Sequence, residues 1–127
     1  MSLNQDFVSW DNHQSWYGRV LINNNRHLYV GYTDGVLFGM VRFDKSENQD
    51  HTYDISINLD PKQRGKGLRK LLLPKAIEHF WKQVADASLI LAEIKKENVA
   101  SKKAFENAGF EEQRASATLC EFSLSRR

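Results

Sequence analysis

The sequence predicts an α/β domain in which strands and helices form one layered sandwich. One observation is the stretch from Asp54 to Leu73, which reads in turn as a strand, a basic glycine loop and a helix. Another is the pair of β-rich segments on either side of Asp34-Gly35, which indicates an antiparallel hairpin. Because the chain has 127 residues and a hydrophobic content of 41%, we expect residues 1–127 to form a single domain around one core.

The composition excludes several classes of protein. A net charge of +2 is too small to predict a nucleic-acid partner. No apolar run approaches the ~20 residues that cross a bilayer, and the first residues carry no signal segment, so we expect a cytoplasmic protein without a membrane partner. Residues 1–9 are expected to be a flexible or tag-derived start. Cys120 is predicted to be a buried thiol, and His13 has no partner at metal-ligand spacing, so no metal is expected.

The first element is predicted to be a helix. Ser9 or Asp11 would cap its start, and the Asn23-Asn24-Asn25 cluster would end it. The i, i+4 spacing that predicts this helix is formed by Trp16, Tyr17, Val20 and Leu21.

The next two elements are predicted to be antiparallel strands. They run from His27 to Thr33 and from Val36 to Asp44, and both are rich in β-branched and aromatic residues. Asp34-Gly35 between them is a typical two-residue turn, and the polar segment from Lys45 to Asp50 is predicted to be a loop.

The central part of the chain is predicted to be a strand, a loop and a helix. Apolar and polar residues alternate from Ile55 to Leu59, and Asp60-Pro61 ends this strand. A basic loop from Lys62 to Lys66 leads into a helix from about Gly67 to Val84, which Pro74 should kink. The apolar residues that this helix should bury are Leu68, Leu72, Ile77, Phe80 and Trp81.

The last part of the chain adds a strand, a helix and a hairpin. Ser88 to Ile94 is predicted to be a short buried strand, and Asn98 should cap a helix from Val99 to Ala108 that Gly109 ends. Two weaker strands complete the chain, from Phe110 to Arg114 and from Thr118 to Ser123.

The basic glycine loop suits an anionic ligand. A helix that begins at Gly67 exposes unpaired N–H groups at its positive end, and glycines let a phosphate approach the backbone closely. Neither common nucleotide motif fits, because there is no Gly-x-x-x-x-Gly-Lys-Ser/Thr, and Lys70 stands where a dinucleotide loop has its third glycine. A glycine used only for turn geometry remains an alternative.

The loop resembles the acyl-CoA loop of the GNAT superfamily of N-acetyltransferases, Gln/Arg-x-x-Gly-x-Gly/Ala. Arg64, Gly67 and Arg69 occupy the defined positions, and Arg69 departs from the usual Gly or Ala. The family's second motif, Asn-x-x-Ala/Ser-x-x-x-Tyr/Phe-x-x-x-Gly-Phe, appears later in the chain, as Asn98, Ser101, Phe105, Gly109 and Phe110. The resemblance extends from about Trp10 to Leu124.

The resemblance implies a mixed, mostly antiparallel central sheet flanked by helices, with acetyl-CoA as co-substrate and no metal. The family usually begins with a strand and a helix that are missing or shortened here, so we expect self-association or a missing N-terminal segment. The residues that the resemblance assigns to the cofactor are Ile57, Asn58 and Leu59 along the pantetheine, Arg64, Gly65, Lys66, Gly67, Leu68 and Arg69 around the pyrophosphate, and Asn98, Ser101 and Phe105 on the later helix.

Acetyl transfer also needs a neutral amine. An amine with a pKa of ~10.4 is mostly protonated at neutral pH, so a base assists, and Asp54 and Glu93 are the candidates on the two flanking strands. Phe105 occupies the place of the family's usual tyrosine acid, and a thiol of pKa ~8.5 can leave without one.

The function implied by the resemblance is transfer of an acetyl group from acetyl-CoA to a primary amine by direct attack. The strings Val41-Arg42-Phe43-Asp44 and Ala92-Glu93-Ile94 resemble the branch that acts on aminosugar nucleotides or polysaccharide precursors. The acceptor is therefore expected to be an aminosugar nucleotide or a related small-molecule amine. The alternatives are a protein or peptide amine as acceptor, and a regulatory module that binds CoA without catalysis.

Overall fold

The computed structural model describes residues 4–9, 15–23, 25–60 and 68–126. In these residues it contains eight strands and two helices. In chain order they are β1 (Asn4–Ser9), β2 (Ser15–Asn23), β3 (Arg26–Thr33), β4 (Val36–Lys45), β5 (Thr52–Leu59), α1 (Leu68–Gln83), β6 (Leu89–Lys95), α2 (Val99–Asn107), β7 (Glu111–Ala115) and β8 (Leu119–Ser125).

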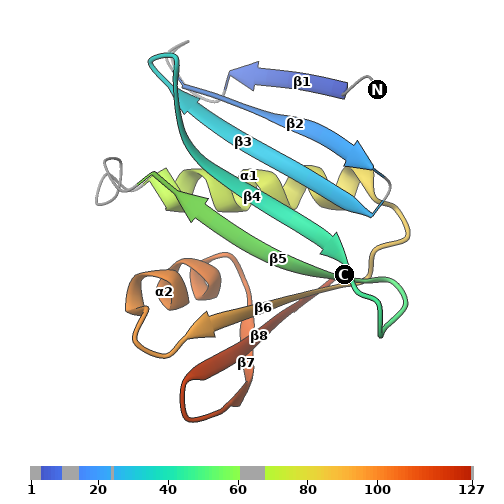
Figure 1. The fold of residues 1–127 in the computed structure, drawn as a ribbon, viewed down its shortest axis with the longest axis vertical. Coiled ribbons are helices and arrows are strands. Elements are labelled where there is room, and N and C mark those ends of the chain that lie inside the picture. Colours follow the sequence, from blue (N-terminus) through green and yellow to red (C-terminus); the bar gives the residue numbers. More distant parts are fainter. Residues whose placement is uncertain (1–3, 10–14, 24, 61–67, 127) are drawn as a thin grey trace.

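All eight strands belong to one sheet, in the order β1-β2-β3-β4-β5-β6-β8-β7 (Figure 1). Every neighbouring pair is antiparallel except β5 and β6, which are parallel. The parallel pair follows from the chain path, because α1 carries the chain from the end of β5 back to the start of β6. The predicted α/β class with a mixed, mostly antiparallel sheet is confirmed.

The β3–β4 hairpin is confirmed together with its turn. Asp34 and Gly35 have φ angles of 52° and 77°, and two consecutive positive φ angles are typical of the type I′ turn that suits twisted strands. Strand β4 then pairs along its length with β5, from Gly39 opposite Leu59 to Lys45 opposite Tyr53.

The main core lies between α1 and the face of the sheet that this helix covers (Figure 1). Phe80 of α1 stacks on Phe43 of β4 at 4.1 Å between ring centroids and meets Tyr53 of β5 edge-on at 5.0 Å. Leu72 and Ile77 are buried beside them, as predicted. Burial of each such side chain contributes about 1.5–3 kcal/mol, so these contacts hold α1 on the sheet. Pro74 lies inside α1, which continues through it.

The second helix begins and ends as the sequence indicates. Asn98 Oδ1 accepts a hydrogen bond from the Ser101 backbone N–H at 3.2 Å, which is an N-cap contact. Gly109 follows the helix with a φ of 101°, a conformation that glycine adopts without strain. Strands β7 and β8 follow as predicted, and α2 packs against α1.

The helix predicted around Trp16 to Leu21 is wrong, because Ser15–Asn23 forms strand β2 between β1 and β3. A spacing of four residues is an even number, so the pattern that indicated a helix also fits the period of two in a strand. Gly18 and several β-branched and aromatic residues in this segment favour the strand. The start of the chain expected to be flexible also contains a strand, Asn4–Ser9.

Candidate active site

Strands β5 and β6 separate partway along their length. They pair only from Thr52 opposite Leu89 to Asp54 opposite Leu91, although β5 continues to Leu59 and β6 to Lys95. From there on, β5 keeps its pairing with β4, and the opposite edge of β5 has no strand partner among the described residues. An unpaired strand edge can hydrogen-bond an extended ligand, so the geometry of this fork suits a narrow chain.

The end of β5 is held in place from one side. Leu59 is buried and Ile57 packs against the core, whereas Asn58 is exposed. The N–H of Asp60 donates a hydrogen bond to the Phe38 carbonyl at 2.8 Å directly after the strand. The structure therefore places Ile57, Asn58 and Leu59 on the strand that borders the fork. The resemblance assigns these residues to the pantetheine arm, and that contact stays a prediction.

The predicted pyrophosphate loop lies only partly within the described residues. Arg64, Gly65, Lys66 and Gly67 fall in the segment 61–67, outside the described residues. Helix α1 begins at Leu68, so Leu68 and Arg69 form its first turn. A helix N-terminus thus follows the end of β5, as the resemblance requires, and the pyrophosphate contacts remain a prediction.

The second motif has structural roles that the contacts define. Asn98 caps α2, and Ser101 is buried at the first turn. Phe105 is 2% exposed and meets Phe110 edge-on at 5.0 Å between ring centroids. Packing in the core therefore accounts for Phe105, and contact of these residues with a cofactor remains a prediction.

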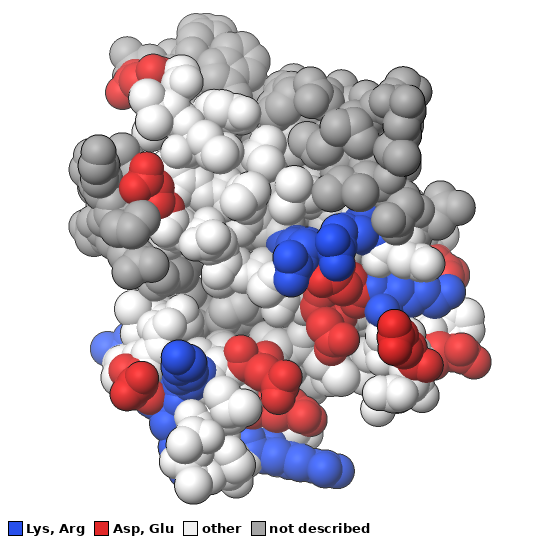
Figure 2. Space-filling view, in the orientation of Figure 1, with Lys and Arg blue, Asp and Glu red and all other residues white. Residues whose placement is uncertain are grey.

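The two candidate bases lie on the same face of the sheet, at the fork. Asp54 is the last residue of β5 that pairs with β6, and Glu93 lies two residues beyond its partner Leu91. Both side chains are exposed, whereas their neighbours Ile55 and Ala92 are buried on the side of α1. Figure 2 shows the face turned away from α1, on which acidic and basic side chains lie next to one another below the centre.

Asp54 is harder to ionise than an ordinary aspartate. Partial burial raises the pKa of its carboxyl above the usual value of 3.8, and the negative charges of Glu93, Asp44 and Glu121 raise this pKa further, in that order. Sequence reasoning missed Asp44 and Glu121, which the strand register brings to this site. Asp44 is the cross-strand partner of Asp54, and Glu121 is that of Glu93.

Asp44 differs from Asp54 because it has two cationic partners. Arg26 Nε contacts its Oδ1 at 2.7 Å, and Arg42 Nε contacts its Oδ2 at 2.8 Å. One carboxylate of the cross-strand pair is thus neutralised by arginines, while the other is surrounded by negative charge. The two opposed carboxylates therefore have different charged neighbours.

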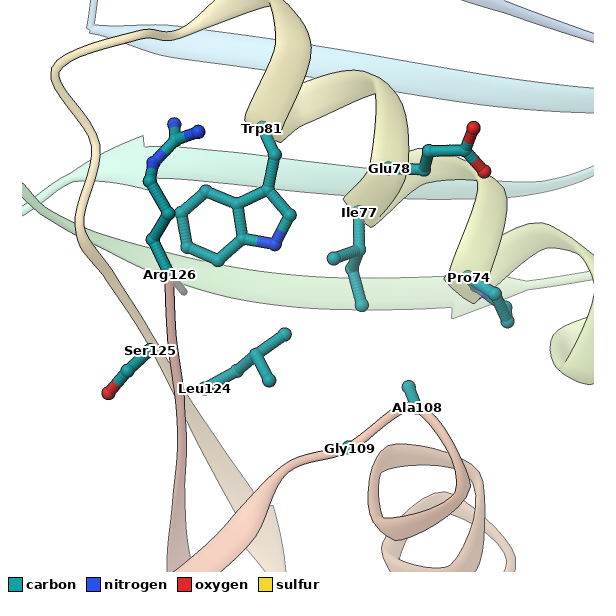
Figure 3. Close-up of a pocket in the computed structure, with 9 residues that line it drawn as sticks. All are labelled: Pro74, Ile77, Glu78, Trp81, Ala108, Gly109, Leu124, Ser125 and Arg126. Carbon is teal, nitrogen blue, oxygen red and sulfur yellow. The ribbon is translucent and has the colours of Figure 1, made fainter.

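A pocket of about 520 Å³ lies on the other face of the sheet, between α1, the end of α2 and β8. Its walls include Ile77, Trp81 and Leu124, and the Arg126 guanidinium lies 4.6 Å from the centre of the Trp81 ring (Figure 3). Arg126 also donates hydrogen bonds to the carbonyls of Val84 and Ala87, both at 2.7 Å. These bonds satisfy carbonyls beyond the end of α1, so Arg126 stabilises the fold here.

The described residues contain no group of His, Cys, Asp and Glu side chains that could hold a metal ion. Within the same residues, no helix is long and apolar enough to span a membrane.

A comparison of the sequence with protein families gives a match over most of the chain. Residues 2–110 match the model described as the acetyltransferase (GNAT) family. The chain belongs to the GNAT acetyltransferase family. GNAT enzymes transfer an acetyl group from acetyl-CoA, so acetyl-CoA is the co-substrate of the family to which the chain belongs. No curated protein matches the chain significantly.

Solved structures share this fold at low sequence identity. Spermidine N-acetyltransferase from Vibrio cholerae, in complex with CoA and spermine, matches with a TM-score of 0.71 and 17% identity over 80% of this chain and 66% of its own. The putative acetyltransferase yncA from Salmonella typhimurium, with acetyl-CoA, matches with a TM-score of 0.69 and 22% identity over 79% of this chain and 64% of its own. N-acetyltransferase PseH from Campylobacter jejuni matches with a TM-score of 0.67 and 13% identity over 83% of this chain and 71% of its own. The chain thus spans about two thirds of the length of these structures.

Proposed function

We propose that this GNAT chain acetylates a small-molecule primary amine by direct attack of the amine on the thioester of acetyl-CoA. The observation that carries the proposal is the fork at Asp54, where an unpaired strand edge and a carboxylate with a raised pKa meet. The edge suits the extended pantetheine arm, and the carboxylate suits removal of a proton from the amine.

The cofactor would follow β5 towards the start of α1. Ile57, Asn58 and Leu59 supply the backbone edge for the pantetheine arm, and the segment from Arg64 to Arg69 supplies N–H groups and positive charge for the pyrophosphate. Acetyl-CoA supplies the activated acetyl group. Residues of the chain bind the cofactor, orient the amine and accept its proton.

The proton is the main chemical problem, because the attacking amine must be neutral. Asp54 accepts this proton directly or through a water molecule, and its raised pKa brings its proton affinity closer to that required at neutral pH. Glu93, on the other side of the fork, attracts and orients the acceptor. The CoA thiol has an ordinary pKa of ~8.5 and leaves as the thiolate. The reaction therefore does not need an acidic side chain at the position of Phe105.

The charges at the fork favour an acceptor with a cationic amine. Four carboxylates, those of Asp44, Asp54, Glu93 and Glu121, interact across adjoining strands, and of these four it is Asp44 whose charge is offset by ion pairs within the described residues. Polyamines present such an amine. Aminosugar nucleotides, the substrates of the family branch that the sequence strings on β4 and β6 resemble, present one too. A protein amine is the alternative acceptor.

The test is turnover of acetyl-CoA by the purified chain with a panel of amines: an aminosugar nucleotide, glucosamine, spermidine and a lysine peptide. We expect release of CoA thiol with at least one of the small amines and N-acetylation of that amine by mass spectrometry. Binding of acetyl-CoA without release of thiol in the presence of any amine would instead indicate a regulatory module. Transfer to the peptide alone would indicate a protein acetyltransferase.

A further inference from the structure

Asp44 is held by two arginines next to the candidate base. Each of its carboxylate oxygens contacts a different guanidinium, Arg26 from β3 at 2.7 Å and Arg42 from β4 at 2.8 Å. Asp44 and Asp54 are directly opposed on β4 and β5, and residues so opposed have Cα atoms about 4.5–5.5 Å apart. The bridge therefore holds the negative charge of Asp44 on the strand next to Asp54, with one guanidinium on each oxygen of Asp44.

Other charged groups face Asp54 from the neighbouring strands. Glu93 on β6 and Glu121 on β8 both disfavour its ionised form, as does Asp44 itself. Within the described residues, Arg26 and Arg42 are the cations that form ion pairs with this group of carboxylates. Both arginines contact Asp44, so the bridge determines where the Asp44 carboxylate is held relative to its cross-strand partner Asp54.

We infer that the Arg26–Asp44–Arg42 bridge is a positioning element for acetyl transfer, which holds the Asp44 carboxylate beside Asp54, the carboxylate that accepts the proton. This inference rests on the proposed function. Asp54 takes one proton from the ammonium form of the amine. As the neutral nitrogen then forms its bond to the acetyl carbon, the C–S bond breaks, CoA leaves as the thiolate, and the second proton of the nitrogen passes to solvent water. Asp44 contacts none of the reacting atoms and acts through Asp54.

A purely structural role would have different consequences. The arginine side chains are 47% exposed and that of Asp44 is 29% exposed, and ion pairs at such exposed sites stabilise folds only weakly. Loss of the bridge should therefore change the proton affinity of Asp54 far more than it changes the stability of the domain.

The test is the titration of the Asp54 carboxyl carbon by NMR in the intact chain and in two variants. In Asp44→Asn the neighbouring negative charge is lost and the arginines are freed, so the midpoint of Asp54 should move to lower pH by about half a unit or more. In Arg42→Gln the charge of Asp44 is less compensated, so the midpoint should move to higher pH. The rising limb of kcat with the best amine of the panel should shift in the same directions, with little change in the KM for acetyl-CoA.

The matched control is Lys82→Gln, which breaks an exposed ion pair with Glu78 on α1, on the other face of the sheet. It should leave the Asp54 midpoint unchanged. Circular dichroism of all variants verifies folding. An Asp54 midpoint that stays in place in Asp44→Asn would overturn the inference, whereas absence of turnover in the unmodified chain would contradict the proposed function instead.

Discussion

Leu59 lies directly against Gly39, at the position where β4 and β5 end their pairing. A Cβ atom added at Gly39 would come within 2.5 Å of Leu59 Cδ2 and within 3.2 Å of the Asn58 carbonyl oxygen. The absence of a side chain at Gly39 therefore lets the last residues of β5 approach β4 closely. Since these residues border the fork, the contact sets the position of the edge on which the cofactor is proposed to bind.

Gly39→Ala should displace the end of β5. We expect a loss of about 1–3 kcal/mol in the free energy of unfolding, because the new methyl group overpacks a tight site, and weaker binding of acetyl-CoA. Denaturant unfolding and calorimetry measure the two effects. Gly35→Asn is the control, because its turn position has no atom near an added Cβ and asparagine tolerates a positive φ. Unchanged stability and affinity in Gly39→Ala would show that the close approach is dispensable.

The elements that could be predicted from the sequence are those with a local signal. Asp34-Gly35 encodes its own turn, and Asn98 and Gly109 mark the ends of α2 by their conformational preferences. The pattern in strand β2 also predicts a helix because Trp16 and Val20, like Tyr17 and Leu21, are four residues apart, a spacing that both periods accommodate. Only the pairing of β2 with β1 and β3 decides between them, and pairing is a non-local property.

In the candidate site, too, the residues that could be predicted are those with a local sequence signal. Asp54 and Glu93 were found because they lie on strands beside the loop motif. Asp44 and Glu121 were missed because their place at the site depends on the strand register, which no short pattern reveals. The point where β5 and β6 separate is likewise set by packing in three dimensions.

Gly67→Val should abolish binding of acetyl-CoA while the domain stays folded. A branched side chain at this position of the predicted loop obstructs approach of a phosphate to the backbone, and loss of the anion contacts should weaken binding at least about tenfold, or ~1.4 kcal/mol. Calorimetry with CoA measures the affinity, and circular dichroism verifies the fold. An affinity equal to that of the unmodified chain would show that the pyrophosphate binds elsewhere.

Asn98 variants separate its role as a helix cap from a role in cofactor binding. Asn98→Ala removes the hydrogen bond to the Ser101 N–H and should cost about 1 kcal/mol of stability. Asn98→Asp keeps the cap, so its melting temperature should stay close to that of the unmodified chain. If the amide also contacts the CoA arm, Asn98→Asp should still bind CoA more weakly. Equal affinity in Asn98→Asp would restrict Asn98 to capping.

The raised pKa of Asp54 also has a consequence for stability. The folded state disfavours the ionised form, so the contribution of this group is fully present below its ordinary pKa of 3.8 and is lost as pH rises through the folded-state pKa. Asp54→Asn is neutral at every pH and should melt at a higher temperature than the unmodified chain at pH 7. The difference should shrink as pH falls towards about 3. Thermal melts over this range measure it, and a difference independent of pH would contradict the assigned charge environment.

Asp54 and Glu93 should affect different kinetic parameters, because they lie on opposite sides of the fork. Asp54 precedes Ile57 by about 10 Å along the strand, so a water molecule can relay the proton to it, whereas the longer side chain of Glu93 can reach the acceptor. Asp54→Asn should lower kcat by about 10²–10⁴-fold at neutral pH and displace the rising limb of its pH profile. Glu93→Gln should mainly raise the KM for the amine. Glu106→Gln, on the exposed side of α2, is the control and should change neither parameter. A kcat for Asp54→Asn that equals that of the unmodified chain across the acidic limb would remove Asp54 from the mechanism and leave Glu93 or water as the base.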